Sequence, residues 1–103
     1  MEQLERIIYM EKLLDEATEA VSALKKALER YNSMHKKLQE LDAYYTSREW
    51  RQDFDDDSSG KLPANLKRGV LSEDAVYDLL EQNAQLLRTL RSVALHAKAA
   101  ETQ

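Results

Sequence analysis

Apolar residues repeat every seven positions over the first third of the chain. Two such rows contain Ile7, Leu14, Val21, Leu28 and His35, and Met10, Ala17, Leu24, Tyr31 and Leu38. Nine of these ten positions are apolar or aromatic, and a third row from Leu13 to Leu41 widens the face. Three apolar positions per heptad suit a helix bundle better than a strict two-stranded coiled coil. The pattern therefore predicts one long amphipathic helix.

The whole chain is predicted to be all-α. No Gly or Pro interrupts residues 2 to 45, which predicts a helix of this length. Two short helices are expected over about 48–56 and 63–68, and a second long helix over about 72–100. We call the segment between the two long helices the connector. Residues 1–103 then form a single helical domain, as expected for a chain of this size.

Capping signals mark the ends of these helices. Ser47 and Ser72 are candidate N-caps, and Leu71 is placed to pack on Val76 across the second cap. Pro63 suits the first position of the second short helix, and Gly69 its end.

The distribution of charge predicts how the two long helices pack. Residues 1 to 20 carry six acids against two cations, whereas residues 25 to 40 carry five cations against two acids. The last helix has the same order along the chain, because its acids come first and its cations follow. Antiparallel packing places each acidic half beside a basic half, so we expect an antiparallel helical hairpin.

The two predicted helices differ in length, which leaves the start of the first helix without a partner. This N-terminal apolar segment comprises Leu4, Ile7, Ile8, Met10, Leu13 and Leu14. An exposed apolar patch of this kind marks an interface. The sequence therefore predicts a homodimer that forms a four-helix bundle, or capture of an unknown protein partner. The alternative is that the connector folds back over these residues.

The composition argues against several classes of protein. The formal net charge is −4, which does not favour binding to nucleic acid or to an anionic membrane. Cysteine is absent, so disulfides and thiolate metal sites are excluded. No apolar run reaches membrane-spanning length, and the start lacks the features of a signal peptide. We expect a cytoplasmic protein with no nucleic-acid or membrane partner.

Four of the seven aromatic residues fall within residues 44 to 54, at the start of the connector, and many charges lie nearby. The candidate connector surface consists of Trp50, Asp53, Asp57, Lys67, Arg68, Asp74, Tyr77 and Asp78. One interpretation is a pocket walled by Trp50, Tyr77 and the pair Lys67 and Arg68. The other is that these residues only close the hairpin, with ion pairs from Lys67 and Arg68 to nearby aspartates.

Recognisable catalytic, cofactor and metal motifs are missing from the sequence. Residues 55 to 62 resemble the opening of a calcium loop, but Leu66 stands where a bidentate Glu is required. Neither His35 nor His96 follows a Glu at the spacing used in di-iron bundles. We therefore expect no catalytic residues, no cofactor and no metal, and a protein that is not an enzyme.

Two motifs resemble a known family. They are the segment containing Tyr44, Tyr45, Trp50, Arg51 and Phe54, and the stretch Leu-Lys-Arg-Gly-Val-Leu-Ser-Glu-Asp at residues 66 to 74 with Tyr77 after it. The chain resembles small bacterial proteins catalogued only as the domain of unknown function 4298 family. This resemblance implies a bacterial, cytoplasmic, all-helical protein, and it transfers no activity.

Together these features predict a protein-interaction or assembly module. A second hypothesis is an acidic inhibitor that binds a basic protein surface through residues 53 to 57. A third is a small-ligand or metal binder at the aromatic connector. Salt dependence separates the first two, because binding through charge weakens as the ionic strength rises and apolar assembly does not.

Overall fold

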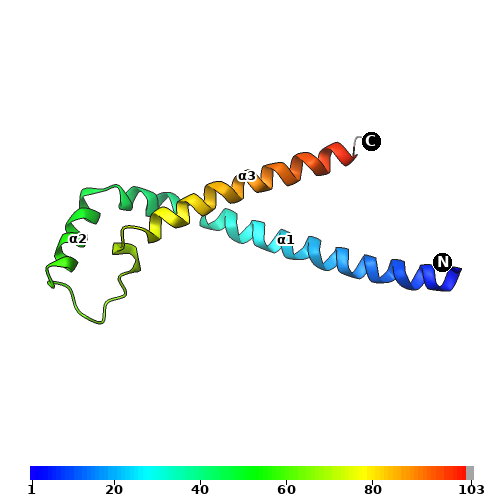
Figure 1. Ribbon diagram of the computed structural model, residues 1–103, viewed down its shortest axis with the longest axis horizontal. Coiled ribbons are helices and arrows are strands. Elements are labelled where there is room, and N and C mark those ends of the chain that lie inside the picture. Colours follow the sequence, from blue (N-terminus) through cyan, green and yellow to red (C-terminus); the bar gives the residue numbers. More distant parts are fainter. Residues whose placement is uncertain (102–103) are drawn as a thin grey trace. The chain divides into compact units, whose positions relative to one another are not determined.

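The computed structural model describes residues 1–101 and is all-α, which confirms the predicted class. Its elements are α1 (Gln3–Tyr45), α2 (Arg48–Ser58), the short 3₁₀ helix η1 (Gly69–Leu71) and α3 (Ala75–Glu101), coloured in chain order in Figure 1. Within residues 1–101 there is no β-strand. The chain divides into two compact units, one ending at Leu38 and the other beginning at Gln39.

The first unit consists of α1 up to Leu38. The helix begins one residue after the predicted start and ends at the predicted Tyr45, because no Gly or Pro interrupts it. None of its residues is buried. A helix of this length with no buried residue depends on further packing for its stability, because most helical stability in proteins comes from burying an apolar face.

The second unit contains the end of α1, the connector and α3. Ser47 caps α2 as predicted, and its side-chain oxygen accepts a hydrogen bond from the Trp50 backbone N–H at 3.1 Å. The helix runs two residues beyond the predicted end and closes at Gly60, whose φ is +74°. The Gly60 and Lys61 N–H groups donate to the carbonyls of Asp57 and Asp56, which is a Schellman motif.

The predicted helix over 63–68 is wrong. This stretch contains a single turn, closed by a hydrogen bond from the Leu66 N–H to the Pro63 carbonyl. The Arg68 guanidinium donates to the carbonyls of Pro63 and Ala64 at 2.8 and 3.1 Å. An α-helix would offer those two carbonyls to the backbone N–H groups of residues 67 and 68. The arginine side chain therefore takes the place of helical hydrogen bonds.

The start of α3 agrees with the predicted cap. The Ser72 hydroxyl accepts a hydrogen bond from the Ala75 N–H at 3.1 Å, and the regular helix begins at Ala75. The Asp78 N–H bonds to the Asp74 carbonyl at 2.8 Å, which continues the helical pattern. In the described part of the chain, none of the helices combines the length and the apolar character that crossing a membrane would require.

A small core lies in the second unit. Trp50, Leu71 and Val76 are the buried hydrophobic residues of the structure. They come from α2, η1 and α3, and η1 contacts both of the other elements. The connector is therefore a folded element around η1. The antiparallel pairing of the two long helices stays a prediction.

Candidate functional site in the connector

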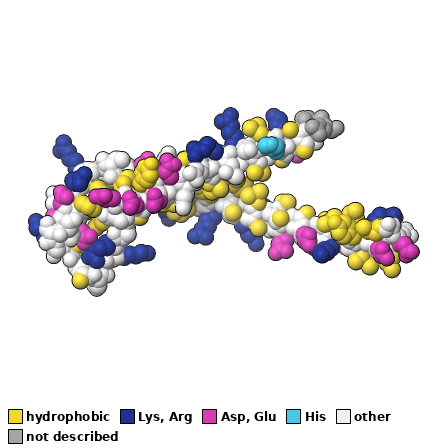
Figure 2. Space-filling view, in the orientation of Figure 1, with side chains coloured by type: hydrophobic (Ala, Val, Ile, Leu, Met, Phe, Trp, Pro, Cys, Tyr) yellow, Lys and Arg dark blue, Asp and Glu magenta, His cyan; other side chains and the backbone are white. Residues whose placement is uncertain are grey.

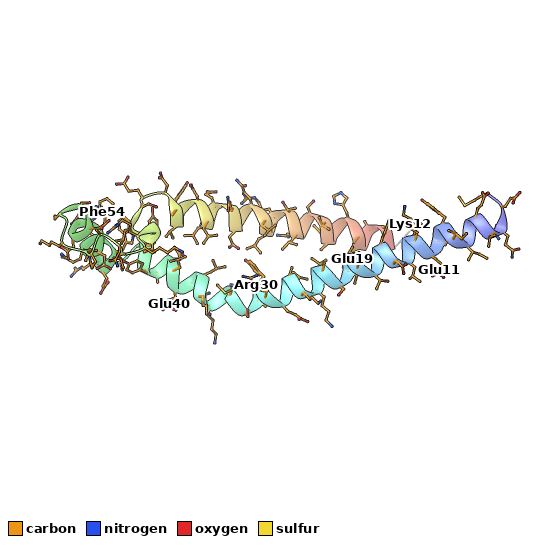
Figure 3. All side chains as sticks on the ribbon, turned by 90° about the horizontal axis from the view of Figure 1, so that it is seen from below. Glu11, Lys12, Glu19, Arg30, Glu40 and Phe54 are labelled. Atoms are coloured by element: carbon orange, nitrogen blue, oxygen red, sulfur yellow. The ribbon has the colours of Figure 1, made fainter. Side chains whose placement is uncertain are left out.

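An aromatic cluster joins α2 to η1. The ring of Trp50 stacks on Phe54 with centroids 5.1 Å apart, and it forms a T-shaped pair with Tyr45 at a centroid distance of 5.3 Å. Its indole Nε1–H donates to the Val70 carbonyl at 2.8 Å. Figure 3 shows Phe54 within the dense group of connector side chains. Since a buried indole N–H needs an acceptor, this bond fixes where η1 lies against α2.

A tyrosine hydrogen bond ties the end of α1 to the start of α3. The Tyr45 hydroxyl donates to the Glu73 carbonyl at 2.6 Å. This carbonyl lies in the turn that leads from η1 into α3. The two ends of the connector are therefore joined by a direct hydrogen bond.

Arg68 forms the central ion pair of the connector. Its Nε donates to Asp57 Oδ1 at 2.9 Å, and both side chains are partly buried. This pair confirms one of the predicted contacts between the cations and the connector aspartates. Lys67, Asp74 and Asp78 form no ion pair with any described residue, so the network predicted around them is limited to Arg68 and Asp57.

The phenol of Tyr44 holds a carboxylate. Its hydroxyl donates to Asp53 Oδ2 at 2.5 Å across the break between α1 and α2. This hydrogen bond, together with burial and the negative charge of Asp53, raises the pKa of Tyr44 to about 12. The phenol is therefore neutral at physiological pH and serves as a fixed donor to Asp53.

A cavity of about 310 Å³ lies beside this tyrosine and aspartate pair. The residues that line it are Tyr44, Asp53, Leu62, Leu66, Lys67, Val70 and Leu71. The lining thus contains aliphatic side chains together with one acid, one cation and one phenol.

The predicted pocket walled by Trp50, Tyr77 and the two cations is therefore wrong in its composition. Trp50 fills the core, Arg68 is occupied by Asp57, and only Lys67 of that set lines the cavity. Tyr77 is 55% exposed, whereas its neighbour Val76 is 3% exposed. Side chains of successive helical residues point about 100° apart. Because Val76 lies on the buried face of α3, Tyr77 lies outside that face.

The N-terminal apolar segment lies in the first unit, at the start of α1. All six side chains are exposed, from 38% for Leu13 to 70% for Leu4. Figure 2 shows hydrophobic side chains gathered on the part of α1 that adjoins the N-terminus. The structure thus places every predicted residue of this surface in contact with solvent.

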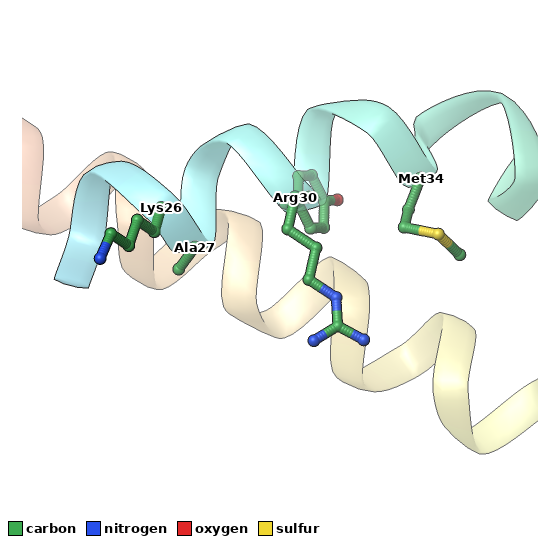
Figure 4. Close-up of a pocket in the computed structure, with 5 residues that line it drawn as sticks. Lys26, Ala27, Arg30 and Met34 are labelled. Carbon is green, nitrogen blue, oxygen red and sulfur yellow. The ribbon is translucent and has the colours of Figure 1, made fainter.

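A shallow hollow of about 470 Å³ lies further along α1. It is lined by Lys26, Ala27, Arg30, Tyr31 and Met34, all of α1. Figure 4 shows Lys26, Ala27, Arg30 and Met34 in succession along this helix. Ala27, Tyr31 and Met34 belong to the heptad rows, and the cations Lys26 and Arg30 lie beside these rows. This arrangement is an apolar helix face bordered by positive charge.

Three acidic residues of α2, Asp53, Asp56 and Asp57, have local side-chain partners. Besides Asp53 and Asp57, the Asp56 carboxylate accepts from Gln52 at 2.9 Å and pairs with Lys61 at 3.8 Å. No group of three or more His, Asp or Glu side chains within residues 1–101 is arranged to hold a metal ion. The acidic run therefore supports the fold of the connector.

Sequence reasoning identified Asp53 and Lys67 but missed Tyr44 as the residue that orients Asp53. Tyr44 and Asp53 are nine positions apart and lie on different helices, so no helical spacing relates them. The only local signal is the Ser47 cap, which turns the chain between α1 and α2.

A family model with the description "Domain of unknown function (DUF4298)" matches residues 7–92 of the chain. The match covers most of α1, the entire connector and the greater part of α3. No curated protein and no solved structure matches the chain.

Proposed function

Because the chain belongs to the DUF4298 family, whose description assigns no activity, we propose from its structure that it is a non-enzymatic assembly module. In this proposal a second copy of the chain covers the N-terminal apolar segment. The observation that carries the proposal is the exposure of all six apolar side chains at the start of α1.

The lengths of the helices support this proposal. α1 has 43 residues and α3 has 27, so a hairpin of the two leaves 16 residues of α1 uncovered, roughly 24 Å of helix. The Trp50 and Arg68 side chains bond within the second unit, so the connector is stabilised by contacts of its own.

Energetics favour covering these side chains. Full burial of one Leu, Ile or Met side chain contributes about 1.5 to 3 kcal/mol relative to exposure. The simplest symmetric assembly is a two-fold dimer, in which the same segment of each copy meets at the axis. With each chain folded as an antiparallel hairpin, the dimer is a four-helix bundle. We place this assembly in the cytoplasm.

The test is the molar mass in solution, measured by light scattering over a hundredfold range of concentration. The double variant Ile7→Asp and Leu14→Asp places two charges in the apolar row and is expected to be monomeric. Lys12→Asp changes the net charge by the same two units outside the apolar rows, so it serves as the matched control and should remain a dimer. Equal molar masses for the wild-type chain and the double variant would refute the proposal.

A further inference from the structure

The cavity of the connector is shallow and open to solvent, and its lining combines apolar with charged groups. Its volume of about 310 Å³ lies at the lower end of the range for ligand pockets. Four aliphatic residues, Leu62, Leu66, Val70 and Leu71, form its apolar part. Leu66 is 44% exposed, so a large apolar side chain stands in contact with water at this cavity. An apolar ligand group would remove that side chain from water.

One negative and one positive group line the same cavity. Asp53 presents a carboxylate whose Oδ2 is occupied by Tyr44, and no described residue donates to its Oδ1. Lys67 is exposed and forms no ion pair with any residue that the structure describes, Asp53 included. The cavity therefore offers one free acceptor with negative charge and one free cationic donor.

We propose that this cavity binds a free α-amino acid with an apolar side chain, such as leucine or phenylalanine. Asp53 accepts hydrogen bonds from the ammonium group, Lys67 pairs with the carboxylate, and the side chain packs on the leucines. A molecule with both charges on one carbon and an apolar side chain uses every group in the lining. A fatty acid would leave Asp53 without a partner, and a simple amine would leave Lys67 without one.

The surrounding contacts hold the site in shape before a ligand arrives. The Trp50 indole N–H donates to the Val70 carbonyl at 2.8 Å and so holds Val70 in place. Arg68 bonds to both the Pro63 carbonyl and Asp57, which ties the turn after Pro63 to α2. Tyr44 fixes the orientation of the Asp53 carboxylate. Binding therefore requires ordering of the Lys67 side chain, whereas the Asp53 carboxylate is already oriented. This site is independent of the N-terminal apolar segment, so the proposal does not rest on dimer formation.

The test is isothermal titration calorimetry of the full chain with leucine and four related molecules. Leucinamide lacks the carboxylate, N-acetylleucine lacks the ammonium group, glycine lacks the side chain, and phenylalanine keeps all three features. We expect leucine and phenylalanine to bind, and each of the other three to bind about tenfold more weakly or worse, because each loses one contact.

Two variants assign the charges to their residues. Lys67→Gln should weaken leucine binding about tenfold and abolish the preference for leucine over leucinamide. Asp53→Asn should abolish the preference for leucine over N-acetylleucine. Lys98→Gln and Asp42→Asn make the same charge changes at exposed positions outside the cavity and should bind as the wild-type chain does. Thermal unfolding of every variant verifies that it is folded.

Absence of heat with both leucine and phenylalanine at millimolar concentration would overturn the proposal. So would leucine binding that Lys67→Gln leaves unchanged, because Lys67 is exposed and its replacement does not disturb the core. Equal binding of leucine and leucinamide to the wild-type chain would also overturn it, and would instead indicate recognition of a free amine or a peptide N-terminus.

Discussion

At the scale of single residues, hydroxyl and guanidinium groups hold the connector together. Tyr44, Tyr45 and Arg68 each bond to an atom at least nine positions away in the sequence through their side chains. The sequence predicted that Arg68 pairs with a nearby aspartate, with Asp57 as one of four candidates, and the structure identifies Asp57. It did not predict the acceptors of the two tyrosines. Every residue has a backbone carbonyl, so the sequence does not indicate that the carbonyl of Glu73 is the acceptor for Tyr45.

Because the pKa of Tyr44 is raised, the stability of the connector decreases at alkaline pH. The folded pKa is about 12 and the ordinary value is 10.0, so the folded chain holds this proton more tightly. The stabilisation is therefore complete below pH 10 and is lost as the pH rises from about 10 to about 12.

We expect Tyr44→Phe to lower the free energy of unfolding by about 1 to 2 kcal/mol at pH 8, a value reduced for the partial exposure of the pair. This deficit should disappear as the pH approaches 12. Chemical denaturation at a series of pH values measures it. Tyr77→Phe removes an exposed hydroxyl and is the control. A deficit for Tyr44→Phe that is constant from pH 8 to 12 would contradict the assigned linkage.

At the scale of elements, local signals predicted the two long helices and α2, but the helix expected over 63–68 is absent and η1 was not predicted. The long run without Gly or Pro gave α1, and serine caps gave the starts of α2 and α3. The stretch 63–68 has Pro at its start and Gly after its end, which is a helical signal. Its backbone carbonyls are nevertheless bonded by the Arg68 side chain. A tertiary ion pair that positions the arginine overrides the local preference, and the same turn forms part of the cavity that sequence reasoning described incorrectly.

Arg68 should therefore be sensitive to replacement by another cation. Lysine has one ammonium group and cannot bond to Asp57, Pro63 and Ala64 in a fork. We expect Arg68→Lys to lower the free energy of unfolding by about 1 to 2 kcal/mol and Arg68→Ala by about 2 to 3 kcal/mol, because the alanine variant leaves Asp57 unpaired as well.

Thermal denaturation followed by circular dichroism measures both changes. Arg48→Lys, at an exposed position in the same unit, controls for the substitution itself. If Arg68→Lys were as stable as the wild-type chain, the charge alone and not the fork would hold the turn.

At the scale of the whole molecule, most of the apolar surface belongs to the long helices, and the buried core lies where the connector meets the start of α3. Only three hydrophobic residues are buried within the described chain, and all lie in the second unit. The sequence pattern predicted which residues of α1 form an apolar face, because heptad spacing determines the face. It could not determine what covers that face, since any apolar partner of suitable length satisfies the same pattern.

The proposed assembly should respond weakly to salt. Apolar burial is not screened by ions, whereas contacts between exposed charges are. We expect the dissociation constant of the dimer to change less than threefold between 50 mM and 500 mM NaCl, measured by sedimentation equilibrium. A tenfold or larger weakening would favour an interface built from charges, as in the hypothesis of an acidic inhibitor.

The packing of Trp50 also gives the protein an intrinsic optical reporter. The chain contains one tryptophan, and it is buried between Tyr45, Phe54 and η1. Its emission therefore arises from the connector alone, without a contribution from the first unit. Separation of two copies at Ile7 would leave the emission maximum where it is, whereas opening of the connector would shift it to longer wavelength. Assembly and connector folding can thus be followed separately in one unlabelled sample.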